Sequence, residues 1–197
     1  IKTNKQKDLA LIFSEEPSVA AGLFTLNQVV SPTITWCQEI LKSSKRFRAI
    51  VVNSGNANAC TGPKGMEDCK SLASKLSQKL SVEPKEILIA STGIIGVPLP
   101  INKIVKALPA LSSKLSPMGW VSSAEAIMTT DLTPKFKSLS FYIGKDKITM
   151  GGIAKGSGMI HPNMATMLAF IATDAAIDKK TLGRALREAN NQTFNRI

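Results

Sequence analysis

Short apolar segments rich in β-branched residues alternate along this chain with segments whose apolar residues recur at helical spacing, and this alternation constrains the fold most. The clearest strand is Ala49–Asn53, with the sequence AIVVN, because a β-branched apolar run of this length is typical of a buried strand. The clearest helix is Met66–Leu80, where apolar residues recur three or four positions apart with Lys and Gln between them. The two patterns together predict an α/β or α+β protein.

The other expected elements follow the same two patterns. The remaining predicted strands are Leu9–Phe13, Ile87–Ala90, Phe136–Ile143, Lys147–Met150 and Thr166–Ala172. The remaining predicted helices are Thr33–Leu41, Ile104–Leu115, Pro117–Met128 and the segment from Asp178 to Ala189. We expect Pro109 to kink the helix that contains it, because proline lacks the N–H of an interior hydrogen bond. We expect Asp178 to cap the last helix.

The charge balance bears on the partners of the protein. The 197 residues carry a formal net charge of +11, from 25 Lys and Arg against 14 Asp and Glu. A nucleic-acid-binding protein concentrates such charge on one face and offers aromatic side chains for stacking. Here aromatic residues make up 5%, and the densest basic cluster is only Lys42, Lys45, Arg46 and Arg48. These features favour a lysine-rich surface with some attraction for anionic small substrates, and a non-enzymatic nucleic-acid-binding module stays as an alternative.

The cysteines and the apolar runs indicate the compartment. Cys37, Cys60 and Cys69 form no C-x-x-C pair and leave one over in any pairing, which fits a reducing compartment better than a disulfide scaffold. We expect Cys60 and Cys69 to be core thiols. The run Leu9–Phe13 is too short for a signal-peptide core, and no segment approaches a membrane span. The expectation is a soluble, cytoplasmic protein without a membrane partner.

Several common catalytic arrangements do not fit the sequence. The single histidine, His161, cannot supply a His-based metal cluster, so we expect no metal site. With one histidine and no G-x-S-x-G segment, a Ser-His-Asp hydrolase is also disfavoured. The segment Gly151–Gly158 (GGIAKGSG) is similar to a phosphate-binding loop, but Lys155 precedes Gly156, whereas that motif needs lysine after its second glycine.

A hydroxyl nucleophile in this chain would therefore need another base. An N-terminal threonine provides one, because its own α-amine can take the proton from its side chain, and that amine has a pKa of about 7.7–8.0. Such a residue is exposed only by cutting the translated chain. The candidate is Thr166, which follows the sequence GMIHPNMA and precedes an apolar strand.

The segment Lys155–Ala175 (KGSGMIHPNMATMLAFIATDA) closely resembles the glutamate N-acetyltransferase/ornithine acetyltransferase family of arginine biosynthesis. Three further blocks resemble that family in the same order: Asn53–Gly62 (NSGNANACTG), Ser91–Pro100 (STGIIGVPLP) and Ala126–Lys135 (AIMTTDLTPK). The resemblance covers essentially the whole chain, and four specific blocks in register argue against coincidence.

The resemblance implies a precursor that cleaves itself between Ala165 and Thr166, with 1–165 belonging to an α-chain and 166–197 beginning a β-chain. It implies a layered α/β sandwich with the new threonine terminus on a central strand, and an α2β2 assembly of the processed pieces. Thr166 would take the acetyl group of N2-acetylornithine as an ester and pass it to glutamate in a ping-pong cycle. No cofactor is implied.

The resemblance also implies roles for single residues. Thr92 and Gly93 would stabilise the oxyanion of the tetrahedral intermediate. Thr129 and Lys155 would contact the substrate together with Thr166, and the Lys155 ammonium suits an α-carboxylate. His161, before Pro162, is expected to shape the turn before the cut. Three asparagines of the first block are expected to hold their loop through bonds to the backbone: Asn53, Asn56 and Asn58.

Three matters stay open at this point. The family pattern extends beyond both Ile1 and Ile197, so we expect this chain to be a fragment without the family's later substrate contacts. The residues do not decide whether acetyl-CoA is a second acetyl donor. An N-terminal-nucleophile amidase or aminopeptidase, which would hydrolyse the acyl-enzyme, is the alternative enzyme.

Overall fold

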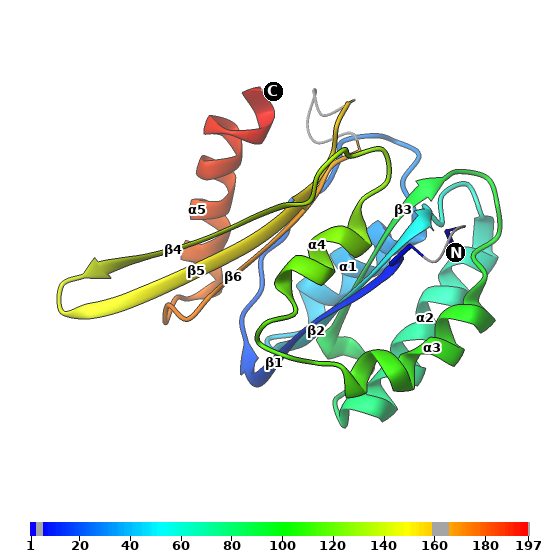
Figure 1. Ribbon diagram of the computed structural model, residues 1–197, viewed down its shortest axis with the longest axis horizontal. Helices are drawn as coiled ribbons and strands as arrows, with labels where there is room; N and C mark the ends of the chain where they lie inside the picture. The colour runs from blue at the N-terminus through cyan, green and yellow to red at the C-terminus, as the bar shows by residue number, and fades with distance from the viewer. Residues whose placement is uncertain (3–5, 159–165, 197) are drawn as a thin grey trace.

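The computed structural model describes residues 1–2, 6–158 and 166–196. Within these residues the strands form two three-stranded sheets, and four of the helices surround the first sheet (Figure 1). The strands are β1 (Leu9–Ser18), β2 (Phe47–Asn56), β3 (Ile87–Ile94), β4 (Lys135–Ile143), β5 (Asp146–Lys155) and β6 (Leu168–Thr173). The helices are α1 (Pro32–Ser43), α2 (Gly62–Leu80), α3 (Ile101–Ser113), α4 (Trp120–Ile127) and α5 (Lys179–Gln192), with short 3-10 helices at Pro84–Glu86 and Phe194–Arg196.

The first sheet has the strand order β1-β2-β3. β1 runs antiparallel to β2, and β2 runs parallel to β3 with Val51 opposite Ile89. Parallel neighbours need a crossover connection, which α2 supplies. Val51 and Val52 are 1% and 0% exposed. This burial accounts for the unbroken apolar run in AIVVN, because a strand covered on both faces has no solvent side.

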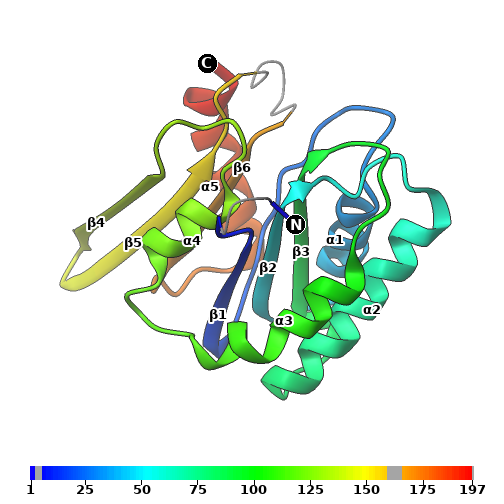
Figure 2. The same cartoon turned by 45° about the vertical axis from the view of Figure 1, so that its right-hand side comes forward.

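The two faces of the first sheet have different covers, since successive residues of a strand point to opposite sides. Val51 packs in one cluster with Leu76 of α2 and Leu108 of α3. Val52 packs in another with Ile127 of α4. Figure 2 shows α2 and α3 on one side of the sheet and α4 on the other.

The second sheet is antiparallel, in the order β4-β5-β6. The β4–β5 hairpin turns at Gly144, whose φ of +62° lies in the left-handed region that glycine enters without steric cost. Ile153 of β5, 2% exposed, joins the cluster of Val52 and α4. This contact fastens the second sheet to the first at the end of β5. α5 follows β6 and lies beside the second sheet, away from the first (Figure 1).

The predicted α/β class is confirmed, and each predicted strand and helix is present with shifted ends. α3 continues through Pro109, and Asp178 caps α5 by accepting hydrogen bonds from the N–H groups of Lys180 and Thr181. The start of one strand differs from the prediction: the strand expected to begin at Thr166 begins at Leu168. Within the described residues, β6 lies at one end of the order β4-β5-β6.

The prediction for one cysteine is wrong. Cys69 is buried as expected, but Cys60 is exposed. Cys60 has a φ of +56° in the loop before α2, and this turn carries its side chain away from the core that the helix covers. Among the described residues, none of the helices combines the length and apolar character needed to cross a membrane.

Candidate active site

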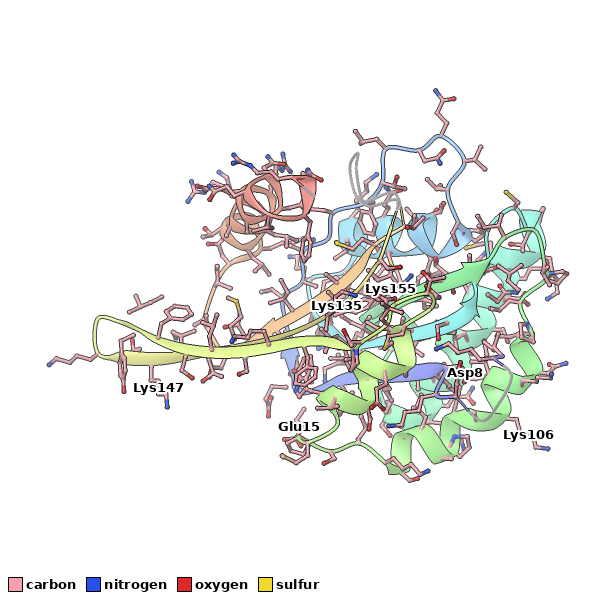
Figure 3. The ribbon with its side chains drawn as sticks, turned by 45° about the horizontal axis from the view of Figure 1, so that its top comes forward. Asp8, Glu15, Lys106, Lys135, Lys147 and Lys155 are labelled. Atoms are coloured by element: carbon pink, nitrogen blue, oxygen red, sulfur yellow. The ribbon has the colours of Figure 1, made fainter. Side chains whose placement is uncertain are left out.

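Lys155, the last residue of β5, lies where the two sheets meet (Figure 3). It is 5% exposed. Its ammonium donates hydrogen bonds to Thr129 Oγ1 at 2.6 Å and to Thr92 Oγ1 at 3.2 Å. The structure thus brings Thr92, Thr129 and Lys155 together from β3, the loop after α4 and β5.

The electrostatic setting of Lys155 is unusual for a lysine, since that side chain is almost never fully buried. Burial lowers the pKa of Lys155, because desolvation disfavours the charged form. Among the charges of described residues, Asp131 opposes this shift and Lys135 adds to it. The nearby carboxylate of Asp131 therefore favours the charged form of Lys155.

That carboxylate, Asp131, belongs to the block Ala126–Lys135, and the family resemblance implies no role for it. Its side chain is 1% exposed and pairs with Lys135 at 2.6 Å. Burial by itself would raise the pKa of Asp131, but hydrogen bonds from Lys135 and from the N–H groups of Gly156 and Thr129 outweigh it and hold that pKa below its ordinary value. The signal that could have found it is an acid two residues after Thr129, a candidate site residue, and four residues before Lys135.

Gly93 follows Thr92 at a close approach of two strands. Its φ is +136°, and a Cβ at this position would lie 2.3 Å from the carbonyl carbon of Gly55 and 2.5 Å from the backbone nitrogen of Asn56. Only glycine fits such a contact. Gly93 is exposed, so its backbone is accessible next to the Thr92 hydroxyl.

The three asparagines of the first block hold the loop after β2, as predicted. Asn53 Nδ2 donates to the carbonyl oxygen of Asn56 at 2.8 Å. Asn56 Nδ2 donates to the carbonyl oxygen of Val97 at 3.0 Å, and Asn58 Nδ2 to that of Gly65 at 3.0 Å. These bonds join the β2 loop to the segment that follows β3 and to the start of α2, and so they support the Gly93 approach.

Thr166 lies at the same end of the second sheet as Lys155. Leu168, two residues after it, pairs with Lys155 across β5 and β6. Thr166 is exposed, and its hydroxyl donates to the carbonyl oxygen of Gly158 at 3.2 Å. The predicted cleavage partner Ala165 and the predicted turn residue His161 lie outside the described residues.

The hydrogen-bond chemistry of the cluster follows from its donors. A lysine ammonium has three donors and no acceptor, so both threonine hydroxyls accept from Lys155 and keep their own protons for another partner. Among the described residues, Lys155 uses two of its donors on these hydroxyls. As far as the described residues show, this leaves two hydroxyl protons and one ammonium proton for an incoming oxyanion or carboxylate.

A metal or cofactor would need other residues. In the part of the chain that the structure describes, 1–2, 6–158 and 166–196, there is no group of three or more His, Cys, Asp or Glu side chains placed to hold a metal ion. A surface hollow of about 370 Å³ lies elsewhere, lined by Val29, Val30, Pro32, Thr35, Cys60, Thr61, Gly62 and Met66. None of the predicted site residues that the structure describes lines this hollow.

The fold and the cluster define a two-sheet α/β protein with a buried lysine set between two threonine hydroxyls. A family model described as the ArgJ family matches residues 1–197. The chain belongs to the ArgJ family.

Relatives match over the whole chain. The arginine biosynthesis bifunctional protein ArgJ of Caldanaerobacter subterraneus subsp. tengcongensis is 49% identical over 197 residues, which are 100% of this chain and 48% of that protein. The protein of the same name from Geobacter sulfurreducens is 46% identical over 197 residues, 100% of this chain and 50% of that protein. The chain thus spans about half the length of the curated relatives it matches.

Two solved structures are similar to this one. The crystal structure of arginine biosynthesis bifunctional protein argJ from Bacillus halodurans has a TM-score of 0.76 and 36% identity, covering 83% of this chain and 85% of that one. Ornithine acetyltransferase from Mycobacterium tuberculosis, crystallised in complex with ornithine, has a TM-score of 0.68 and 36% identity, covering 80% of this chain and 84% of that one.

Proposed function

We propose that this chain is part of an enzyme that moves the acetyl group of N2-acetylornithine to glutamate through an acetyl ester on Thr166. The observation that carries the proposal is the buried Lys155 ammonium, hydrogen-bonded to Thr92 and Thr129 at the end of the sheet from which Thr166 extends. The ornithine bound in the Mycobacterium tuberculosis relative supports the substrate class.

The proposed acyl transfer begins with attack by the Thr166 oxygen on the acetyl carbonyl carbon. The α-amine of Thr166, free once the preceding peptide bond is cut, takes the hydroxyl proton. The Thr92 hydroxyl, whose oxygen already accepts from Lys155, directs its proton to the oxyanion, and the exposed Gly93 backbone supplies a second donor. When the carbon–nitrogen bond breaks, the α-ammonium returns its proton to the leaving amine of ornithine.

The second half of the cycle reverses these steps with a new amine. The glutamate amine attacks the acetyl ester, the carbon–oxygen bond to Thr166 breaks, and the proton released by glutamate returns to the threonine through its α-amine. In both halves the third donor of Lys155 and the Thr129 hydroxyl bind the α-carboxylate of the amino acid. Both substrates share that carboxylate, which explains why one site can serve both.

Cleavage between Ala165 and Thr166 is the step that makes the nucleophile. Chain lengths support this cleavage. The alignment with the Bacillus halodurans structure covers 83% of this chain and 85% of that crystal chain, and the two chains are therefore of about equal length. The curated relatives are about twice as long. We further propose a cytoplasmic enzyme in which the two pieces stay associated as α2β2, with no cofactor.

Mass spectrometry of the full-length protein tests the cleavage. The wild type is expected to give two pieces that separate before Thr166, and Thr166→Ala is expected to stay intact. A Thr173→Ala variant, in which a threonine at the other end of β6 is changed, is the matched control and should be cut like the wild type. A wild type that stays intact while transferring acetyl groups would refute the proposal.

Product analysis separates transfer from hydrolysis. Ornithine release from N2-acetylornithine should depend on glutamate and yield N-acetylglutamate in equal amount. Release that ignores glutamate would favour the amidase alternative. The same assay with acetyl-CoA in place of N2-acetylornithine determines whether the enzyme has a second acetyl donor.

A further inference from the structure

Asp131 contacts both of the segments that bring Lys155 and Thr129 together. Its Oδ1 accepts hydrogen bonds from Lys135 Nζ at 2.6 Å and from the N–H of Gly156 at 2.7 Å, and its Oδ2 accepts from the N–H of Thr129 at 3.3 Å. A buried carboxylate is costly unless such donors surround it. One side chain therefore binds the loop after α4 and the backbone next to Lys155 at the same time.

The Gly156 bond fixes the direction in which β5 ends. Gly156 has a φ of +146°, a conformation that side chains rarely adopt, and its N–H points at Asp131 directly after Lys155. The Thr129 bond fixes the other partner, because that residue's hydroxyl is 2.6 Å from the ammonium. Without the Asp131 carboxylate, the N–H groups of Gly156 and Thr129 lose the acceptor that they share.

We propose that Asp131 is a positioning residue of the acyl-transfer site, holding Lys155 and Thr129 in place for the substrate carboxylate. The inference rests on the proposed function. It goes beyond that function because Asp131 touches neither substrate nor nucleophile in the proposed cycle and acts only through Lys155 and Thr129.

Opposing charges around Lys155 make the inference testable. Within the described residues, Asp131 raises the pKa of Lys155 and Lys135 lowers it. Lys2, from the first residues of the chain, has its own pKa lowered by burial and by Lys155. Asp131→Asn removes the attraction and keeps an oxygen acceptor, whereas Lys135→Gln removes the repulsion and keeps the carboxylate. The two variants break the same ion pair but should change the charge of Lys155 in opposite directions.

The experiment measures kcat/KM for N2-acetylornithine against pH in the full-length enzyme, where the alkaline limb reports deprotonation of the free enzyme. Asp131→Asn should move this limb to lower pH and raise KM about tenfold, the effect expected for loss of a hydrogen bond to a charged group. Lys135→Gln should move the limb to higher pH. The substrate's own titration is common to all variants.

Asp68→Asn is the matched control. Asp68 is a carboxylate with a 2% exposed side chain, paired with Lys64 at 2.5 Å and four residues apart, so it has the same kind of ion pair on helix α2. Its variant should lose stability without moving the limb. In active enzymes, alkaline limbs of Asp131→Asn and Lys135→Gln that move in the same direction, or that do not move, would refute the role of Asp131. If Asp131→Asn does not fold, an unmoved limb in Lys135→Gln would refute that role by itself. A wild type without acetyl transfer refutes the proposed function itself.

Discussion

The two sheets differ in how completely this chain covers them. In the first sheet, Val51, Val52 and Ile87 are at most 1% exposed, because α2, α3 and α4 pack on its faces. In the second sheet, every residue of β4 is exposed to solvent, including Phe141 at 37% and Ile143 at 61%. The first sheet thus forms a buried core. The second sheet contributes mainly the few side chains that contact the first sheet and the candidate site.

This difference teaches where stability and function should separate. Apolar burial is the largest favourable term in folding, so the first sheet is expected to carry most of the stability of the chain. The candidate site draws Thr92 from the first sheet and Lys155 from the second. Changes in the second sheet should therefore affect the site with smaller effects on unfolding, and paired variants can test this.

The largest contrast is expected for a pair of glycines. Gly93→Ala puts a Cβ 2.3 Å from the backbone of Gly55, at a φ of +136°, and should lower the free energy of unfolding by more than ~4 kcal/mol. Gly144→Ala, in the β4–β5 turn, has open space around its Cβ at a φ of +62° and should cost only about 1–2 kcal/mol. Urea unfolding followed by circular dichroism measures both. Equal costs would break the comparison.

A smaller contrast is expected for apolar truncations. Leu76→Ala, at a residue 0% exposed, should cost about 2–5 kcal/mol through lost contacts and a residual cavity. Ile143→Ala, at a residue 61% exposed, should cost less than ~0.5 kcal/mol. Measuring the pair again in the full-length protein sharpens the comparison. A large cost of Ile143→Ala there would mean that the open face is covered in the whole molecule.

The smallest contrast is expected for helix caps. Ser31 caps α1 by accepting from the N–H of Thr33, and its hydroxyl lies 2.8 Å from the carbonyl oxygen of Asn58 in the β2 loop. Ser31→Ala should cost about 1 kcal/mol. Asp178→Ala, at the exposed cap of α5, should cost less. Thermal unfolding distinguishes them, and a larger effect at Asp178 would contradict the ranking.

The Asp178 cap also has a pH signature. Hydrogen bonds from the side chain and backbone of Thr181, and then from the Lys180 N–H, lower the pKa of Asp178 below its ordinary value. A depressed pKa in the folded state contributes stability above the unfolded-state value of about 3.9, and this contribution is lost as the pH falls further. The stability difference between wild type and Asp178→Ala should therefore be full near pH 6 and disappear in strong acid. A difference that persists there would contradict the cap.

The elements of both sheets could be predicted because their signals are local. Periodicity finds AIVVN and the helix from Met66 to Leu80 without any knowledge of partners. The outward turn of Cys60 could not be predicted, since it depends on one left-handed backbone conformation in a loop. Nor could periodicity show that β6 would stand at the end of its sheet, because strand order is set by pairing between distant segments.

The candidate site divides in the same way. Thr92, Thr129 and Lys155 were found through a family resemblance, and no spacing between them predicts that they meet. Their contact depends on β5 docking against α4, a tertiary event. The burial of Lys155 and the bridging role of Asp131 arise from the same docking. A charged residue looks like a surface residue until the partner segment that covers it is known.

The contact between Lys155 and its two threonines has a consequence for the order of events during synthesis. The three residues enter the growing polypeptide far apart, and Lys155 comes last. A nascent chain that has folded only its first sheet holds Thr92 without Lys155 beside it. The polar centre is therefore complete only after β5 has left the ribosome and docked through Ile153, so the chemistry that depends on it starts no earlier than the closing of the fold.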